Sequence, residues 1–265
     1  MNAALDARLL ARHALGLDAT ALIARERDPV SPEAEARFAG LLARRLSGEP
    51  VARIMGRKEF YGLDFGLNAA TLVPRPETEM LVDFGLQALD SEASAAILDL
   101  GTGTGCIALA LLAHRPRARA LGIDLAPEAA AQAQANAEAL GLAPRFAVRT
   151  GSWFAPLVEG ERFDLIVSNP PYIGSSVIDI LAPEVRDHDP RAALDGGEDG
   201  LAPYRVLAAG LRDRLNPGGQ VAFEIGWDQG AAVAALFSAA GLEDVAVHTD
   251  LSGQDRMVTG RLTPP

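Results

Sequence analysis

The sequence predicts an α/β protein: a doubly wound, mostly parallel β-sheet joined to a small N-terminal helical bundle through a β-hairpin linker. After residue 91, short apolar runs alternate with helical segments, which is the pattern of βαβ units. Before residue 50, the apolar residues recur only at helical spacing. A chain of 265 residues that is 49% hydrophobic and 22% charged can bury a sizeable core, which excludes a disordered or fibrous protein.

Residues 1–50 are expected to form the helical bundle. The first helix runs up to Gly16, a residue that commonly ends helices. The clearest helix begins at Ser31, whose hydroxyl can cap the first turn, and continues with Pro32, whose missing N–H costs nothing there. Gly48 and Pro50 then end this helix.

Residues 51–73 interleave aromatic residues with glycines, which predicts a strand pair linking two domains. The string Pro-Arg-Pro-Glu-Thr-Glu follows at 74–79. Its two prolines forbid a helix before Pro76, and its acidic residues suit the first turn of a helix after it.

Residues 74–265 are expected to form the sheet domain. Its first strand is a continuous apolar run, as in a strand that is buried on both faces. The expected strands are 95–100, 120–124, 146–149, 163–168, 220–225, 245–249 and 257–260, and the expected helices are 104–114, 127–140, 201–215 and 229–240.

A glycine-rich turn follows the first strand of this domain. Alternating glycines between a strand and a helix let the backbone approach a ligand at the helix N-terminus. Cys106 stands where the dinucleotide fingerprint needs a glycine, which disfavours a dehydrogenase. Asp124 ends the next strand, where a carboxylate can accept both hydroxyls of a ribose. The pattern predicts a nucleoside-type cofactor held by this acid and by the turn residues Gly101, Thr102, Gly103, Thr104 and Gly105.

A second motif, Asn169-Pro170-Pro171-Tyr172, directly follows the strand expected at 163–168. That strand should lie beside the strand at 95–100, at the point where ligands bind in such sheets. Two consecutive prolines hold the backbone extended and leave its carbonyl groups pointing outward. An amide oxygen, a rigid carbonyl and an aromatic ring together suit a planar NH2 group, which needs two acceptors and a surface to stack on.

These motifs resemble the class I S-adenosylmethionine-dependent methyltransferases that modify planar nitrogens. With the strings at 59–62, 73–79, 192–201 and 253–261, nearly the whole chain resembles the peptide chain release factor glutamine N5-methyltransferase family. The resemblance implies methylation of the side-chain amide of the glutamine in the Gly-Gly-Gln loop of class I release factors. It implies S-adenosylmethionine as the cofactor and a release factor as the protein partner.

The resemblance also implies roles for individual residues. Residues 75–79 are expected at the rim of the site. Two positions depart from the family pattern: Ser152 replaces an acid expected to accept from the adenine amine, and Arg53 replaces an aromatic residue in the linker, where partner docking could differ. The implied cofactor-binding residues are Gly101, Thr102, Gly103, Thr104, Gly105, Asp124, Trp153 and Asn169, the substrate-binding residues are Asn169, Pro170, Pro171 and Tyr172, and the catalytic residues are Asn169, Pro170 and Tyr172.

The alternative function is methylation of an amino group in a nucleic acid, adenine N6 or guanine N2. The net charge of −11 disfavours it, because affinity for phosphates comes from lysine and arginine contacts. One cysteine and four scattered histidines predict no metal site, and Asp187-His188-Asp189 is expected to be a solvated loop. We expect a monomer in the cytoplasm that contacts neither membrane nor nucleic acid, with residues 1–50 serving partner recognition.

Overall fold

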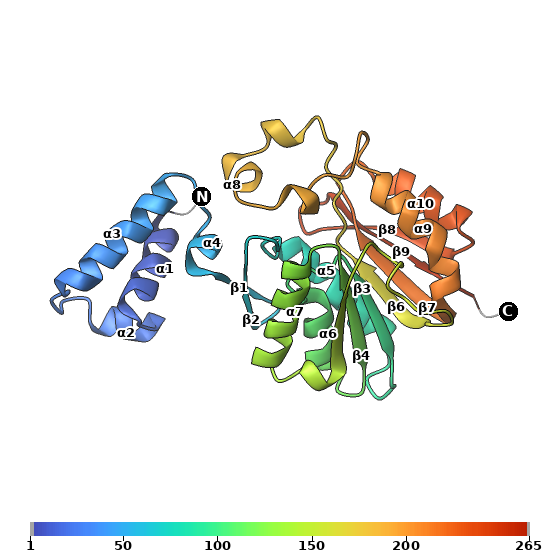
Figure 1. Ribbon diagram of the computed structural model, residues 1–265, viewed down its shortest axis with the longest axis horizontal. Helices are drawn as coiled ribbons and strands as arrows, with labels where there is room; N and C mark the ends of the chain where they lie inside the picture. Colours follow the sequence, from blue (N-terminus) through green and yellow to red (C-terminus); the bar gives the residue numbers. More distant parts are fainter. Residues whose placement is uncertain (1–2, 264–265) are drawn as a thin grey trace.

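A computed structural model describes residues 3–263 and places a helical domain beside an α/β domain (Figure 1). The helical domain begins with α1 (Ala3–Leu15), α2 (Ala19–Ala24) and α3 (Pro32–Leu46). The expected cap of the third helix is confirmed: Ser31 Oγ accepts a hydrogen bond of 3.3 Å from the Ala34 N–H. Helix α1 packs against α3, and Leu10 is fully buried between them and their neighbours.

The expected strand pair at 51–73 is wrong in its first part. Helix α4 (Val51–Met55) occupies this stretch and ends at Gly56, which has a φ of 67°. The extended Pro50 and the left-handed Gly56 bracket a single turn with Ile54 buried, whereas the aromatic pattern of a strand starts only after Gly56. The hairpin itself is confirmed over β1 (Arg57–Phe60) and β2 (Leu63–Gly66), which pair antiparallel.

The turn of this hairpin consists of Tyr61 and Gly62, with φ values of 52° and 77°. Two positive φ values in a two-residue loop are the geometry that matches the twist of the flanking strands. Phe60 and Phe65, on the two strands, are buried in the core of the α/β domain. The linker is therefore packed onto that domain.

Within the described residues, one sheet carries seven strands in the order β5-β4-β3-β6-β7-β9-β8. Neighbouring strands from β5 to β7 pair in parallel, and β9 pairs antiparallel with both of its neighbours. The predicted doubly wound, mostly parallel sheet is confirmed. Its strands are β3 (Ala96–Leu100), β4 (Arg119–Asp124), β5 (Phe146–Thr150), β6 (Phe163–Ser168), β7 (Leu215–Glu224), β8 (Glu243–Thr249) and β9 (Asp255–Arg261).

Helices cover both faces of the sheet, so alternate residues of one strand belong to different cores. In β3, Ile97 packs among residues of α5 (Glu79–Ala88), α6 (Cys106–His114) and α7 (Pro127–Ala139). Leu98 faces the opposite way, toward α9 (Ala202–Arg214) and α10 (Gly230–Ala239). Both faces being buried explains why the strand reads as an unbroken apolar run.

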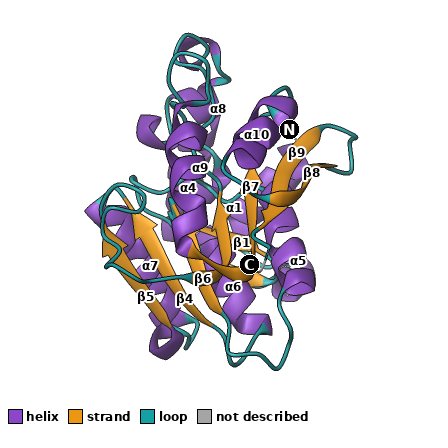
Figure 2. Cartoon of the chain, turned by 90° about the vertical axis from the view of Figure 1, so that its right-hand side faces the viewer, coloured by secondary structure: helices purple, strands orange, loops and turns teal. Residues whose placement is uncertain are grey.

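Short elements complete the chain between these larger ones. They are η1 (Pro76–Thr78), η2 (Ala143–Arg145), η3 (Ile178–Ile180), α8 (Pro183–Arg186) and η4 (Arg191–Ala193). The segment that carries α8 projects beyond the sheet (Figure 2) and lies between the helical domain and α9 (Figure 1). None of the helices in the described part of the chain combines the length and apolar character needed to cross a membrane.

Candidate functional site

The site lies where β3 and β6 end side by side. Leu100 and Ser168 are partners in the parallel register of these strands, and the Ser168 hydroxyl donates to the Leu100 carbonyl at 2.6 Å. The glycine-rich turn therefore leaves the sheet beside Asn169, as the sequence predicted. This juxtaposition follows from the strand order, because the ends of neighbouring parallel strands meet at one edge of the sheet.

Local hydrogen bonds hold the glycine-rich turn. Gly101, Gly103 and Gly105 have φ values of 70°, 55° and 80°, a region that other residues rarely adopt. The Thr102 hydroxyl donates to Asp99 Oδ2 at 2.8 Å, and burial raises the pKa of Asp99 to about 7. The other oxygen of Asp99 is buried without a hydrogen-bond partner among the described residues.

Asp124 joins the turn to the end of β4. Its Oδ2 accepts from the Gly103 N–H at 2.8 Å, and its Oδ1 accepts from the Ala126 N–H at 3.0 Å. Burial raises the pKa of the Asp124 carboxyl above its ordinary value. Because each carboxylate oxygen can accept more than one hydrogen bond, Asp124 can still accept hydrogen bonds from a molecule bound beside it.

A predominantly apolar cavity opens at this edge of the sheet. The predicted cofactor residues that line it are Gly101, Thr102, Gly103, Thr104, Asp124, Trp153 and Asn169, and Pro171 and Ser152 line it too. Gly105 does not line it. That residue precedes α6, and a Cβ there would lie 3.0 Å from Leu109 Cδ1, so its glycine serves the turn and the packing beneath it.

A second cavity adjoins the first, and Arg75 and Asn169 line both. Tyr172 and the charged side chains of Glu77, Glu224 and Arg256 also line the second cavity. Pro170 is buried and is not among the residues that line either cavity. The predicted substrate residues are thus divided: Pro171 faces the first cavity, Tyr172 the second, and Asn169 lies between them.

A chain of hydrogen bonds extends from Asn169 into the core. Asn169 Nδ2 donates to Thr78 Oγ1 at 3.1 Å, and the Thr78 hydroxyl donates to Glu224 Oε2 at 2.6 Å. The Tyr172 hydroxyl donates to Glu224 Oε1 at 3.4 Å. Burial raises the pKa of Glu224 to about 7, and burial and the nearby Glu224 charge raise the pKa of Tyr172.

Glu224 was missed in the sequence. The only signal was an acid within the apolar strand expected at 220–225, a position that a buried strand does not fill with a charge unless the charge has partners. The structure also gives hydrogen-bond partners to residues of the string at 74–79. Thr78 belongs to the chain of hydrogen bonds behind Asn169, and Glu79 accepts from the Tyr61 N–H in the hairpin turn at 3.0 Å.

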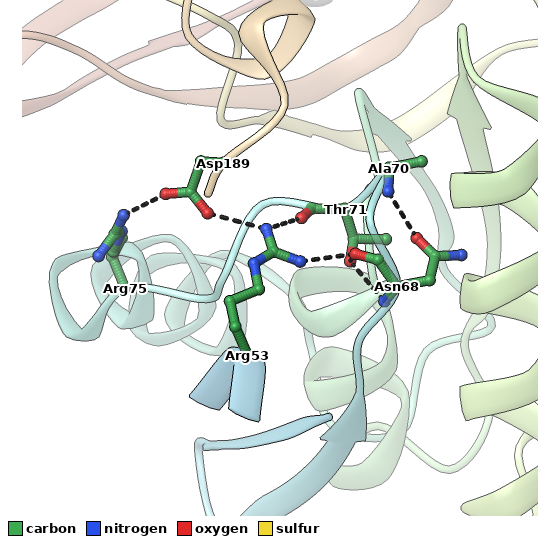
Figure 3. Close-up of polar contacts among 6 residues, drawn as sticks. All are labelled: Arg53, Asn68, Ala70, Thr71, Arg75 and Asp189. Atoms are coloured by element: carbon green, nitrogen blue, oxygen red, sulfur yellow. Dashed lines mark hydrogen bonds and ion pairs between the residues drawn. The ribbon is translucent and has the colours of Figure 1, made fainter. Parts of the chain in front are cut away.

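Asp189 connects the linker with the rim of the site (Figure 3). Its side chain is 1% exposed and accepts from Arg53 at 2.8 Å and from Arg75 at 2.6 Å. Arg53 also donates to the carbonyl groups of Asn68 and Thr71. The two guanidinium groups offset the free-energy cost of burying the Asp189 carboxylate.

One expectation is corrected here. The loop at 187–189 is solvated only in part, because Asp187 is exposed and Asp189 is buried. The side chain of Arg53, which departs from the family pattern, is only 9% exposed and is turned toward Asp189. No group of three histidine, cysteine, aspartate or glutamate side chains in residues 3–263 is arranged to hold a metal ion.

Comparison with known proteins places the chain in a family. Residues 1–56 match the PrmC N-terminal domain, and residues 78–184 match the methyltransferase small domain. A release factor glutamine methyltransferase from Cereibacter sphaeroides is 50% identical over 98% of this chain and 92% of its own length. One from Agrobacterium fabrum is 46% identical over 97% of this chain and 89% of its own length. This chain belongs to the release factor glutamine methyltransferase family.

Solved structures support the fold assigned to this member of the family. A methyltransferase from Pyrococcus furiosus aligns with 85% of this chain and 100% of its own, with a TM-score of 0.58 and 20% identity. A ribosomal protein L11 methylase from Lactobacillus delbrueckii subsp. bulgaricus covers 71% of this chain and 80% of its own, with a TM-score of 0.52 and 21% identity. The sheet is therefore that of a class I methyltransferase.

Proposed function

We propose that this protein transfers a methyl group from S-adenosylmethionine to the side-chain amide nitrogen of the glutamine in the Gly-Gly-Gln motif of class I release factors. The observation that carries the proposal is the meeting of the two cavities at Asn169. One cavity has the features of a nucleoside site, and the other has room beside an amide that can orient a planar nitrogen. The names of the family's curated members support the same substrate.

The residues of the first cavity fit S-adenosylmethionine. Gly101 and Gly103 leave the backbone accessible, and Asp124 has acceptor capacity for the hydroxyls of a ribose. The Trp153 ring lies next to Gly101 and offers a flat face to the adenine, while the Ser152 hydroxyl can accept from the adenine amine. S-Adenosylmethionine, when bound, supplies a sulfonium methyl group that a nitrogen nucleophile can attack.

The protein's own part in the reaction is to orient the glutamine amide. An amide nitrogen is a poor nucleophile because its lone pair is delocalised into the carbonyl. Asn169 Oδ1 accepts from an N–H group of this amide, which directs the nitrogen and raises its electron density, and Tyr172 packs beside it. Such positioning is worth about 7–11 kcal/mol against the bimolecular reference reaction.

Glu224 is not assigned as a general base. Both of its carboxylate oxygens already accept hydrogen bonds, from Thr78 and from Tyr172. The proton that the nitrogen loses after methylation passes to water.

The helical domain, residues 1–50, is proposed to dock the release factor. In support, Arg45 of α3 lies 3.8 Å from Glu184 of α8, so this domain reaches the segment that follows the Asn169 motif. The protein is proposed to act as a cytoplasmic monomer that does not bind nucleic acid directly. The charge of −11 supports the last point.

The test is incubation of the purified protein with labelled S-adenosylmethionine and a purified class I release factor, followed by mass analysis of its peptides. We expect one added methyl group on the glutamine of the Gly-Gly-Gln peptide. A release factor with that glutamine replaced by alanine is the control and should stay unlabelled. Label on ribosomal RNA or on DNA in parallel incubations, with none on the release factor, would refute the proposal.

A further inference from the structure

The hydrogen bonds behind Asn169 all run in one direction. Asn169 donates to Thr78, and Thr78 donates to Glu224, with distances of 3.1 and 2.6 Å. Thr78 is 3% exposed and Glu224 is 2% exposed, so neither depends on solvent to satisfy its polar groups. The two residues come from η1 and from the end of β7, and they meet the motif after β6 only in the folded chain.

The direction of these hydrogen bonds has a chemical cause. Above its pKa of about 7 the Glu224 carboxyl is ionised and only accepts hydrogen bonds, and a hydroxyl has one proton to donate. Because Thr78 gives that proton to Glu224, it can offer only a lone pair to Asn169. The amide of Asn169 must therefore turn Nδ2 toward Thr78, which leaves Oδ1 on the opposite side of the amide.

This orientation matters because an asparagine amide has nearly the same shape after a half-turn about its last bond. In one orientation Asn169 presents an acceptor to the substrate, and in the other it presents two donors. A substrate amide NH2 needs the acceptor, since two NH2 groups facing each other cannot form a hydrogen bond.

We infer that Thr78 and Glu224 are positioning residues that lock the Asn169 amide so that Oδ1 is presented to the substrate amide. The inference rests on the proposed function and assigns a role to the string at 74–79 beyond lining the rim. The network is itself anchored: the Tyr172 hydroxyl donates to the second oxygen of Glu224, and the Tyr204 hydroxyl donates to the Glu224 backbone carbonyl at 2.7 Å.

The decisive variant is Thr78→Val, assayed at pH 8, where Glu224 is ionised; it keeps the shape of the side chain and removes the hydroxyl. We expect kcat to fall about 10-fold to 100-fold, less than the roughly 10²–10³-fold measured when a group that stabilises a transition state is removed outright. The KM for the release factor and the Kd for S-adenosylhomocysteine should stay within about twofold, because Asn169 remains in place and loses only its fixed orientation. Thr78→Ser keeps the hydroxyl and should retain kcat within about threefold.

Thr259→Val is the matched control. Thr259 is 4% exposed, and its hydroxyl lies 2.8 Å from His248 Nε2, outside both cavities. The control shows what loss of a buried threonine hydroxyl does through stability alone, and its kcat should match that of the wild type. If Thr78→Val keeps the kcat of the wild type, or loses no more than the control does, the inference is wrong.

A double-mutant cycle separates positioning from a general structural effect. If Thr78 acts through Asn169, then Thr78→Val should slow a protein that already carries Asn169→Ala by less than about twofold. Independent effects that multiply in the double variant would overturn the inference. Failure of the proposed function is distinguishable, because the wild-type protein would then leave the release factor unmethylated.

Discussion

Glu224 places an acid inside the core, and this predicts a specific dependence of stability on pH. Its pKa is raised by burial from 4.5 to about 7. Between these two values the folded protein holds a proton that the unfolded chain has released. The free energy of unfolding therefore decreases as the pH rises through this window, since stability rises with pH only where the unfolded state binds more protons.

Glu224→Gln removes the ionisation and keeps a side chain of the same length that can form hydrogen bonds. The variant should gain stability relative to the wild type as the pH rises from 5 to 8. With a pKa of 4.5 in the unfolded chain and about 7 in the folded protein, the total effect on the free energy of unfolding is roughly 3 kcal/mol, and about 2.5 kcal/mol of it falls between pH 5 and pH 8.

The assay is urea unfolding of both proteins at several pH values, with the difference in unfolding free energy plotted against pH. Other titrating groups cancel in this difference. Glu159→Gln, which removes a carboxylate that is already exposed, is the control and should give a flat line. A flat line for Glu224→Gln, or stability that falls relative to the wild type as the pH rises, would refute the argument that burial dominates at Glu224.

Three further predictions concern the site and the linker. Asp124→Ala should weaken binding of S-adenosylhomocysteine at least about 10-fold in calorimetric titration, and it should lower stability by only about 1–2 kcal/mol through the loss of two backbone hydrogen bonds; unchanged affinity would contradict the ribose assignment. Asn169→Asp should bind S-adenosylmethionine at least as well as the wild type but turn over more slowly, because the added charge stabilises the sulfonium ground state and the donor to Thr78 is lost. Asn169→Ala should lose more activity still in single-turnover methylation, and a wild-type rate in this variant would show that Asn169 is only a turn residue. Arg53→Met should lower the unfolding free energy in urea by about 3 kcal/mol, because it leaves buried Asp189 with one of its two partners; a loss below about 0.5 kcal/mol would show that Arg75 alone suffices.

Features that depend on residues close together in the chain could be predicted from the sequence. The cap at Ser31, the apolar run of β3 and the glycines of the turn after it are local features, and each was found where the pattern predicted it. The pairing of β3 with β6 could also be predicted, because the order of strands in doubly wound sheets is restricted. The helix at 51–55 was missed because a five-residue turn carries little periodicity of its own.

The hydrogen bonds around Asn169 and the ion pairs of Asp189 depend on long-range contacts and could not be predicted from the sequence. Thr78 and Glu224 are 146 positions apart, and Arg53 and Asp189 are 136 positions apart. No periodicity in the sequence links residues so far apart. Each charged residue, considered alone in the sequence, cannot be told from one on the solvated surface. The fold brings Thr78 of η1 to Glu224 at the end of β7, and Arg53 of α4 to Asp189 after α8, in surroundings where an unpaired charge would be costly. The residue types at the site could thus be read from the chain, whereas the direction in which the Asn169 amide points follows from contacts that exist only in the folded protein.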